Sequence, residues 1–255
     1  MKKLFLLLTL LCLSLSALAH DAEVNGIFYN LDTANKTAAV TFKGDNYWDD
    51  DEYSGDVVIP ETVTYNGVTY SVTSLGDDCF AGCSSLTAIT IPNSVTSLGN
   101  SCFWGCSSLT SITLGNSVKS LGSFCFYGCS SLTSITIPNS VTSVGNDCFN
   151  GCSSLTSIYM LPSTPPSTGY GIFDHTALET VYVVDEDAKT AYQAQVPWNE
   201  YEIVVMPTGI EEVETDKAAP SIVGCYDLNG KLINGKQRGA VIVRYSDGTT
   251  RKVLK

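Results

Sequence analysis

The sequence predicts a β-rich solenoid, an elongated coil in which short units of chain stack on one another. A unit of 23 residues beginning at Ser74 recurs three more times, with only its last copy altered at the end. Each unit contains alternating apolar residues, which is typical of a strand with one buried face. Because a single unit cannot bury its apolar side alone, the units must stack. Each unit keeps one phenylalanine, and we expect these to form one column: Phe80, Phe103, Phe126 and Phe149.

The apolar residues within a unit predict which side chains face the core. The four units occupy residues 74–161. In the first of them Leu86, Ile89 and Ile91 form a short strand with inward side chains, and Gly99, near the start of the second, permits a tight turn. Neighbouring strands in such a stack lie ~4.8 Å apart. Equivalent Leu, Ile, Val, Phe and Cys side chains are therefore expected to form ladders along the coil.

A degenerate unit precedes the clean ones in residues 20–73. Val57 and Ile59 have the spacing of the inward strand residues, and Asn66-Gly67 predicts a hairpin turn. We interpret this segment as an N-terminal cap, since a stacked array needs ends that cover its core.

A second degenerate unit follows in residues 162–205, where residues 178–183 repeat the strand spacing. Residues 186–195 have helical composition, and Trp198 and Tyr201 are expected to close the open end of the core. We interpret this segment as a C-terminal cap.

The two chain ends predict export. Residues 1–19 have a positive start, an apolar run and a small-x-small ending at Ala19, as in a secretory signal peptide. We expect His20 to begin the mature chain, and no later segment is apolar enough to span a membrane. Residues 206–220 are interpreted as a linker, and residues 221–255 as a small all-β module in which residues 240–254 form a hairpin.

The charge is strongly negative, −12 for the whole chain. Residues 20–220 hold 24 acidic and 5 basic residues, whereas residues 221–255 hold 2 acidic and 7 basic ones. Such a body does not suit nucleic acid, because phosphate binding needs clustered Lys and Arg. The change of sign supports a separate terminal module.

The repeat, worded SLGxxCFxGCSSLTSITIPNSVT, resembles the BspA-like leucine-rich-repeat family of bacterial surface proteins. The likeness is close over residues 74–158 and looser over residues 26–205. It implies a leucine-rich-repeat solenoid that adheres to host matrix proteins, other bacteria or surfaces. Most units of that family carry Ala where this chain has the first cysteine of each unit: Cys79, Cys102, Cys125 and Cys148.

The tail resembles the C-terminal sorting domains of type IX secretion in Bacteroidota. The run from Tyr226 to Lys231 and the last four residues, Lys252 to Lys255, carry this likeness, while Cys225 is atypical. The resemblance implies that residues 221–255 engage the type IX secretion machinery. An extracellular or outer-surface location follows from it.

The repeat cysteines form C-x-x-x-C pairs, such as Cys79 with Cys83. Equivalent cysteines on neighbouring units would have Cβ atoms ~4.8 Å apart, beyond the ~3.5–4.5 Å of a good disulfide. A bridge within one unit and a zinc site are two alternatives. We favour buried free thiols that pack as small hydrophobes, and we expect no metal or cofactor.

Other polar groups do not predict catalysis. The run Asp49, Asp50, Asp51 and Glu52 suggests calcium, but its spacing is not that of an EF-hand, so a solvated loop is favoured. His175 is expected to pack locally, and no hydrolase, metalloprotease or nucleotide-binding motif is present. We predict that the protein is not an enzyme, unless a site lies in residues 22–70.

Two sets of residues are candidates for partner binding. Trp104, Phe124 and Tyr127 occupy variable positions on neighbouring units and are candidates for one exposed aromatic patch, although partial burial against neighbouring loops is the favoured interpretation. The outward strand positions form the second set: Thr90, Thr113, Thr136 and Tyr159. The sequence thus favours a secreted or surface protein that binds a protein or glycan. A structural or spacer role in the envelope is the alternative.

Overall fold

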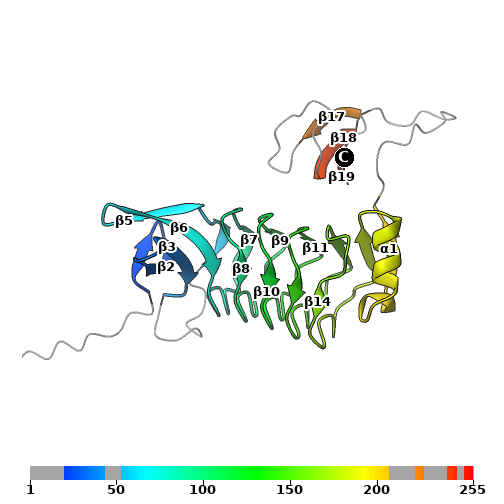
Figure 1. Ribbon diagram of the computed structural model, residues 1–255, viewed down its shortest axis with the longest axis horizontal. Helices are drawn as coiled ribbons and strands as arrows, with labels where there is room; N and C mark the ends of the chain where they lie inside the picture. Colours follow the sequence, from blue (N-terminus) through cyan, green and yellow to red (C-terminus); the bar gives the residue numbers. More distant parts are fainter. Residues whose placement is uncertain (1–19, 44–52, 207–221, 227–239, 246–249, 255) are drawn as a thin grey trace, which may run out of the picture.

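The computed structural model describes residues 20–43 and 53–206 in full, and the backbone of residues 222–226, 240–245 and 250–254. The leader, the acidic run at residues 49–52, the linker from residue 207 and most of the tail lie outside the described residues. The repeats form an elongated coil with strands along two of its sides (Figure 1). Stacking of units is therefore confirmed, and the predicted hairpin at the tail is present as backbone.

One side of the coil carries the strands predicted from the alternating apolar residues. They pair in parallel, unit on unit, with Ile89 beside Ile112 and Ile135 beside Ile158. Two sheets make up this side, in the orders β4-β7-β9 and β11-β13-β15-β16. Their strands are β4 (Gly55–Val58), β7 (Leu86–Thr90), β9 (Ser111–Thr113), β11 (Ser134–Ile137), β13 (Ser157–Met160), β15 (Thr180–Val183) and β16 (Glu202–Val205).

The break between the two sheets falls at the only clean unit that has Leu114-Gly115 in place of Ile-Pro. Gly115 lies so close to the unit before it that an added Cβ would be 2.2 Å from the carbonyl oxygen of Pro92. Only glycine permits this approach. This contact joins the unit to the one before it, with which β9 stays paired, and the break lies on the opposite side of β9, toward β11.

The other side of the coil continues an N-terminal sheet. Its path is β1-β2-β3-β6-β8-β10-β12-β14, and β5 pairs with β6. The hairpin predicted at Asn66-Gly67 is confirmed, because Tyr65 faces Val68 and both turn residues have positive φ angles of 49° and 79°. The strands are β1 (Ala22–Val24), β2 (Ile27–Asp32), β3 (Thr37–Thr41), β5 (Thr62–Tyr65), β6 (Val68–Leu75), β8 (Ser97–Leu98), β10 (Ser120–Leu121), β12 (Ser143–Val144) and β14 (Ser167–Thr168).

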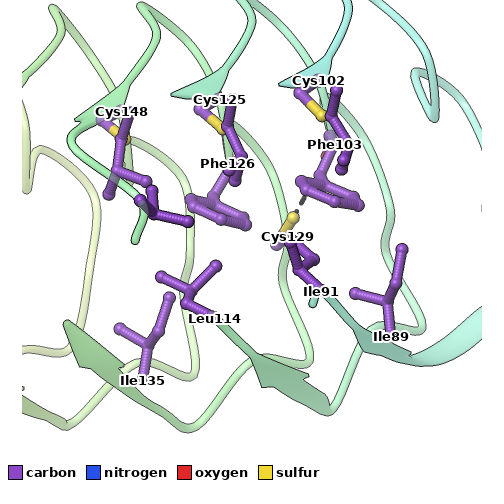
Figure 2. Packing of buried hydrophobic residues seen from close by; sticks show 14 of the residues in the cluster. Ile89, Ile91, Cys102, Phe103, Leu114, Cys125, Phe126, Cys129, Ile135 and Cys148 are labelled. Atoms are coloured by element: carbon purple, nitrogen blue, oxygen red, sulfur yellow. Dashed lines mark hydrogen bonds between the residues drawn. The ribbon is translucent and has the colours of Figure 1, made fainter. Parts of the chain in front are cut away.

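The core of the coil is a column of aromatic rings. Phe80, Phe103, Phe126 and Phe149 stack with centroids 5.1, 5.3 and 5.3 Å apart and interplanar angles of 10° or less. Figure 2 shows Phe103 and Phe126 following one another along the core, beside the first cysteines of their units. All four rings are buried. The predicted alignment of these phenylalanines is confirmed.

The column continues beyond the clean repeats at both ends. Tyr53 lies 4.5 Å from Phe80, and Phe173 lies 5.8 Å from Phe149. At the far end the edges of Trp198 and Tyr201 meet the ring of Phe173, each at 5.4 Å between centroids. Trp198 is 1% exposed, so the last ring of the column is covered rather than open to water.

A helix, α1 (Glu186–Gln193), and a single 3-10 turn, η1 (Trp198–Glu200), stand at this end (Figure 1). The helix begins at Asp185, whose carboxylate accepts a hydrogen bond of 2.7 Å from the backbone N–H of Ala188, an N-cap that satisfies a free donor of the first turn. Tyr192 is buried and donates its hydroxyl to the carbonyl of Pro162 at 3.1 Å. Burial raises the pKa of Tyr192, so this hydroxyl keeps its proton and its hydrogen bond.

The tail contributes a three-stranded antiparallel sheet of β17 (Ile222–Tyr226), β18 (Ala240–Tyr245) and β19 (Thr250–Leu254). Among the helices that the structure describes, none combines the length and the apolar composition needed to cross a bilayer.

Candidate interaction surface

One position of each unit adopts a left-handed backbone. The φ angles of Asp78, Ser101, Phe124 and Asp147 are 57°, 51°, 57° and 50°, and Gly171 fills the same place in the next turn with φ 64°. Asp tolerates this conformation and glycine has no penalty there, but a bulky side chain pays a cost of about 1–2 kcal/mol. Phe124 is therefore the residue least suited to its own backbone.

Backbone hydrogen bonds between units hold this position in a row along the coil. Asp78 N donates to Asn100 O at 2.9 Å, Ser101 N to Ser123 O at 2.8 Å, and Phe124 N to Asn146 O at 2.8 Å. The residues three places later form a parallel row, since Gly82 N donates to Trp104 O and Gly105 N to Tyr127 O, both at 2.7 Å. Trp104 and Tyr127 are thus direct neighbours on successive units.

The three predicted aromatic residues come together on these rows. Trp104 and Tyr127 stack at 6.2 Å with an interplanar angle of 11°, and Phe124 meets Tyr127 at 6.0 Å and 60°. Phe124 is 37% exposed, while Trp104 and Tyr127 are half-buried. We call Trp104, Phe124 and Tyr127 the aromatic cluster. The aromatic cluster lies at the surface, and its three rings partly cover one another.

Acidic side chains stand on either side of the aromatic cluster in the left-handed row. Burial and then the charge of Asp77 raise the pKa of Asp78, against a lowering effect of a hydrogen bond from Ser101. At the other side, Asp147 Oδ1 accepts a hydrogen bond of 2.9 Å from Asn150 Nδ2. Among the residues that the structure describes, none forms an ion pair with Asp78 or Asp147.

His175 takes part in a local contact only. Its Nδ1 is 3.1 Å from Asn150 Oδ1, and the residue is exposed with a φ of 56°. It stands where the earlier units have a glycine with positive φ, such as Gly151. His175 is therefore an exposed side chain that contacts the unit before it.

The outward strand residues form a second, separate surface. Thr90 lies beside Thr113, and Thr136 beside Tyr159, but the two pairs belong to different sheets because of the break after β9. Tyr159 also stacks on Tyr182 at 4.8 Å and 12°. Sequence reasoning missed Tyr182, although its place in the degenerate unit at residues 178–183 marks it as an outward strand position.

The eight repeat cysteines are free and buried, as favoured from the sequence. The sulfurs of Cys79 and Cys102 lie 3.3 Å apart, much closer than the spacing of the strands, yet well beyond the ~2.05 Å of a disulfide bond. The second cysteines are engaged differently, since the thiols of Cys106, Cys129 and Cys152 donate to phenylalanine carbonyls of the preceding unit at 3.0–3.2 Å. Within the described residues, no three Cys, His, Asp or Glu side chains are grouped to hold a metal ion.

A cavity of about 630 Å³ lies in the N-terminal region, where an undetected catalytic site was the remaining alternative. Tyr29, Tyr53 and Asp56 are among the residues that line it. Burial raises the pKa of Tyr29 to about 12, so its hydroxyl is no base at neutral pH. Tyr53 is already engaged, donating to Thr41 O at 2.9 Å and accepting from the N–H of Phe28 at 3.1 Å.

Comparisons with known proteins agree with this architecture. Residues 73–194 match six copies of the family described as BspA type leucine rich repeat region. Among curated proteins, none matches the chain. A leucine rich repeat protein of T. pallidum has a similar solved structure, with 26% identity, a TM-score of 0.53, and coverage of 64% of this chain and 71% of the other.

Two further solved structures have lower TM-scores. A leucine-rich repeat protein from Bacteroides capillosus is 26% identical over 55% of this chain and 96% of its own, with a TM-score of 0.47. A leucine rich cell surface protein from Faecalibacterium prausnitzii is 20% identical over 90% of this chain and 59% of its own, with a TM-score of 0.46. The stacked 23-residue units, the phenylalanine column and the six matched copies lead to one conclusion. Residues 73–194 of this chain match the BspA type leucine rich repeat region in sequence and in the stacking of their units.

Proposed function

We propose that this protein is an exported binding protein whose aromatic cluster contacts a protein or glycan partner on another surface, in the manner of an adhesin. The observation that carries the proposal is the strained and exposed position of Phe124. Its backbone is held in a left-handed conformation that costs about 1–2 kcal/mol for such a side chain, and its ring is 37% exposed. The other units place Asp or Ser there, which avoids much of this cost.

The chemistry of the aromatic cluster supports the same proposal. Trp and Tyr are enriched among the residues that dominate binding energy at interfaces. Here a near-parallel Trp104–Tyr127 pair is held on a rigid scaffold by hydrogen bonds between units, so little freedom is lost when a partner binds. The strand residues Thr90, Thr113, Thr136 and Tyr159 are proposed as a second, weaker contact surface.

A double variant, Trp104→Ala with Tyr127→Ala, tests the aromatic cluster on an array of immobilised matrix proteins and surface glycans. The control is Val68→Ala with Val196→Ala, which removes two exposed apolar side chains that lie outside both proposed contact surfaces. Circular dichroism must show that both variants remain folded. We expect saturable binding to disappear in the first variant and to persist in the second.

Two outcomes contradict the proposal. If the Trp104→Ala, Tyr127→Ala protein binds as the unaltered chain does, the aromatic cluster is not the contact surface. If the unaltered chain has no saturable partner on the array, the alternative of a structural or spacer component of the envelope is favoured. The near-identity of the four units, with few side chains that distinguish one from another, fits that alternative.

Export is a separate part of the proposal and rests on the sequence of the chain ends. Residues 1–19 would direct the chain across the inner membrane, and residues 221–255 would engage the type IX secretion machinery. Antibodies against the body and against the tail, applied to cell fractions and medium, test this. We expect the body outside the cell without its tail. A body retained inside the cell with an intact tail would refute it.

A further inference from the structure

The aromatic cluster lies between two carboxylates on one row of the solenoid. The row runs from Asp78 through Ser101 and Phe124 to Asp147. The backbone N–H of each of the first three donates, at 2.8–2.9 Å, to the carbonyl of the residue just before the next member. Three steps of ~4.8 Å therefore separate Asp78 from Asp147, about 14 Å in all. Trp104 and Tyr127 stack beside the middle of this row.

The charge around this row is unbalanced. Residues 20–206 contain 20 acidic residues against four lysines, and no arginine. Asp78 is half-buried, and the nearby Asp77 raises its pKa further, so the negative charge of Asp78 is poorly compensated. Asp147 has the amide of Asn150 as its hydrogen-bond partner rather than a cation. A cation brought by a partner would relieve both groups.

The rings between the carboxylates suit the same partner. A guanidinium or ammonium group is attracted to the face of Trp or Tyr, and an arginine also stacks on it. Acidic groups on both sides of an aromatic pair therefore favour positive charge, whereas a neutral glycan would gain hydrogen bonds from them but no charge–charge attraction.

We propose that the aromatic cluster, with Asp78 and Asp147 on either side, binds an extended basic segment of a partner protein. This inference rests on the proposed function and names the class of its partner. An extended chain advances ~3.3 Å per residue and shows alternate side chains to one face. Two basic residues four positions apart thus span about 13 Å and reach both carboxylates, while the residue midway between them lies over the aromatic cluster.

Short peptides test this geometry on the full chain in a surface biosensor. The probe is Arg-Ser-Tyr-Ser-Arg with blocked ends. The spacing control, Arg-Arg-Tyr-Ser-Ser, has the same composition, and Glu-Ser-Tyr-Ser-Glu has the opposite charge. We expect the probe to bind at least fivefold more tightly than the spacing control, and its affinity to fall as salt rises. The acidic peptide should not bind.

Variants of the carboxylates complete the test. Asp78→Asn with Asp147→Asn removes both charges while keeping residues that tolerate the left-handed backbone. The matched control, Glu179→Gln with Glu202→Gln, removes two exposed charges near the strand side. We expect about a tenfold loss of affinity for the probe in the first variant, corresponding to ~1.4 kcal/mol, and no change in the control.

The outcomes separate this inference from the proposed function. Equal binding of the probe and its spacing control, or an unchanged affinity in the Asp78→Asn, Asp147→Asn variant, overturns the basic-segment inference. The proposed function survives those results if Trp104→Ala with Tyr127→Ala still abolishes binding to an array partner. It fails, whatever the peptides do, if that double variant keeps its partner.

Discussion

The stacked phenylalanine column makes a quantitative prediction about stability, and Phe126 is the best place to test it. Its ring is fully buried and lies between Phe103 and Phe149, with both centroid distances at 5.3 Å and interplanar angles of 2° and 6°. Replacement by alanine removes two ring contacts and leaves a cavity that the neighbouring units cannot fill, since their spacing is set by backbone hydrogen bonds.

The cost of Phe126→Ala is estimated from buried phenylalanines in general. Truncation of such a residue costs about 3–5 kcal/mol, and each lost aromatic pair accounts for ~0.5–1.5 kcal/mol of that figure. For a folded region of this size, each kcal/mol lowers Tm by about 2–4 °C. We therefore expect Tm to fall by about 8–16 °C, a consequence of roughly 4 kcal/mol lost.

The assay compares thermal and urea unfolding of Phe126→Ala with that of Tyr127→Ala, followed by circular dichroism. Tyr127 is the next residue along the chain, but it is half-buried on the surface in contact with Trp104 and Phe124. Its loss should cost no more than about 2 kcal/mol. If Phe126→Ala is no more destabilising than Tyr127→Ala, the phenylalanine column does not hold the units together.

Three further predictions concern the thiols, a carboxylate and a polar ladder. Burial raises the pKa of Cys102 and Cys148 well above the ordinary value, so these thiols should resist a thiol-reactive reagent at pH 8 in the native protein and react fully in denaturant. Mass spectrometry of labelled peptides measures this, and labelling before unfolding would contradict it. The pKa of Asp78 is raised in the folded protein, so its protonated form favours folding, and that contribution to stability is lost as the pH rises through the raised pKa. Asp78→Asn should therefore increase Tm at pH 7. Thermal melts below pH 3.8, the ordinary pKa, should show no such gain. Asn100 Oδ1 accepts from the backbone N–H of Ser123 at 2.9 Å, so Asn100→Ala should cost about 0.5–1.5 kcal/mol in urea unfolding, and no measurable loss would show that water replaces this contact.

Much of the fold could be predicted because the sequence repeats. Each unit faces the same neighbours as the unit before it, so one pattern of buried residues had to satisfy all units at once. The alignment of the phenylalanines and the Asn66-Gly67 hairpin followed from spacing and turn chemistry alone. The break after β9 did not, because the pairing of strands depends on distances between units that the sequence of one unit does not contain.

The interaction surface was predicted in part. Variable positions just beside a constant phenylalanine placed Trp104 and Tyr127 on neighbouring units, and they do stack. Nothing in the sequence marks the position of Phe124 as left-handed, since its equivalents are Asp, Ser and Asp, which tolerate many conformations. The stacked partner of Tyr159, Tyr182, was missed because its unit has lost most of the repeated wording.

By itself the sequence determined the length of the unit, the identity of its buried ladders, the negative charge of the body and the presence of an aromatic group on two adjacent units. Those properties are local or periodic, and a linear pattern is enough to express them. Only the tertiary structure decided that Phe124 occupies a strained backbone, that Asp78 and Asp147 stand on either side of the aromatic cluster without cations, and that sulfurs of successive units come within 3.3 Å. These features depend on the distances between units, which hydrogen bonds across the stack establish and which no single unit contains.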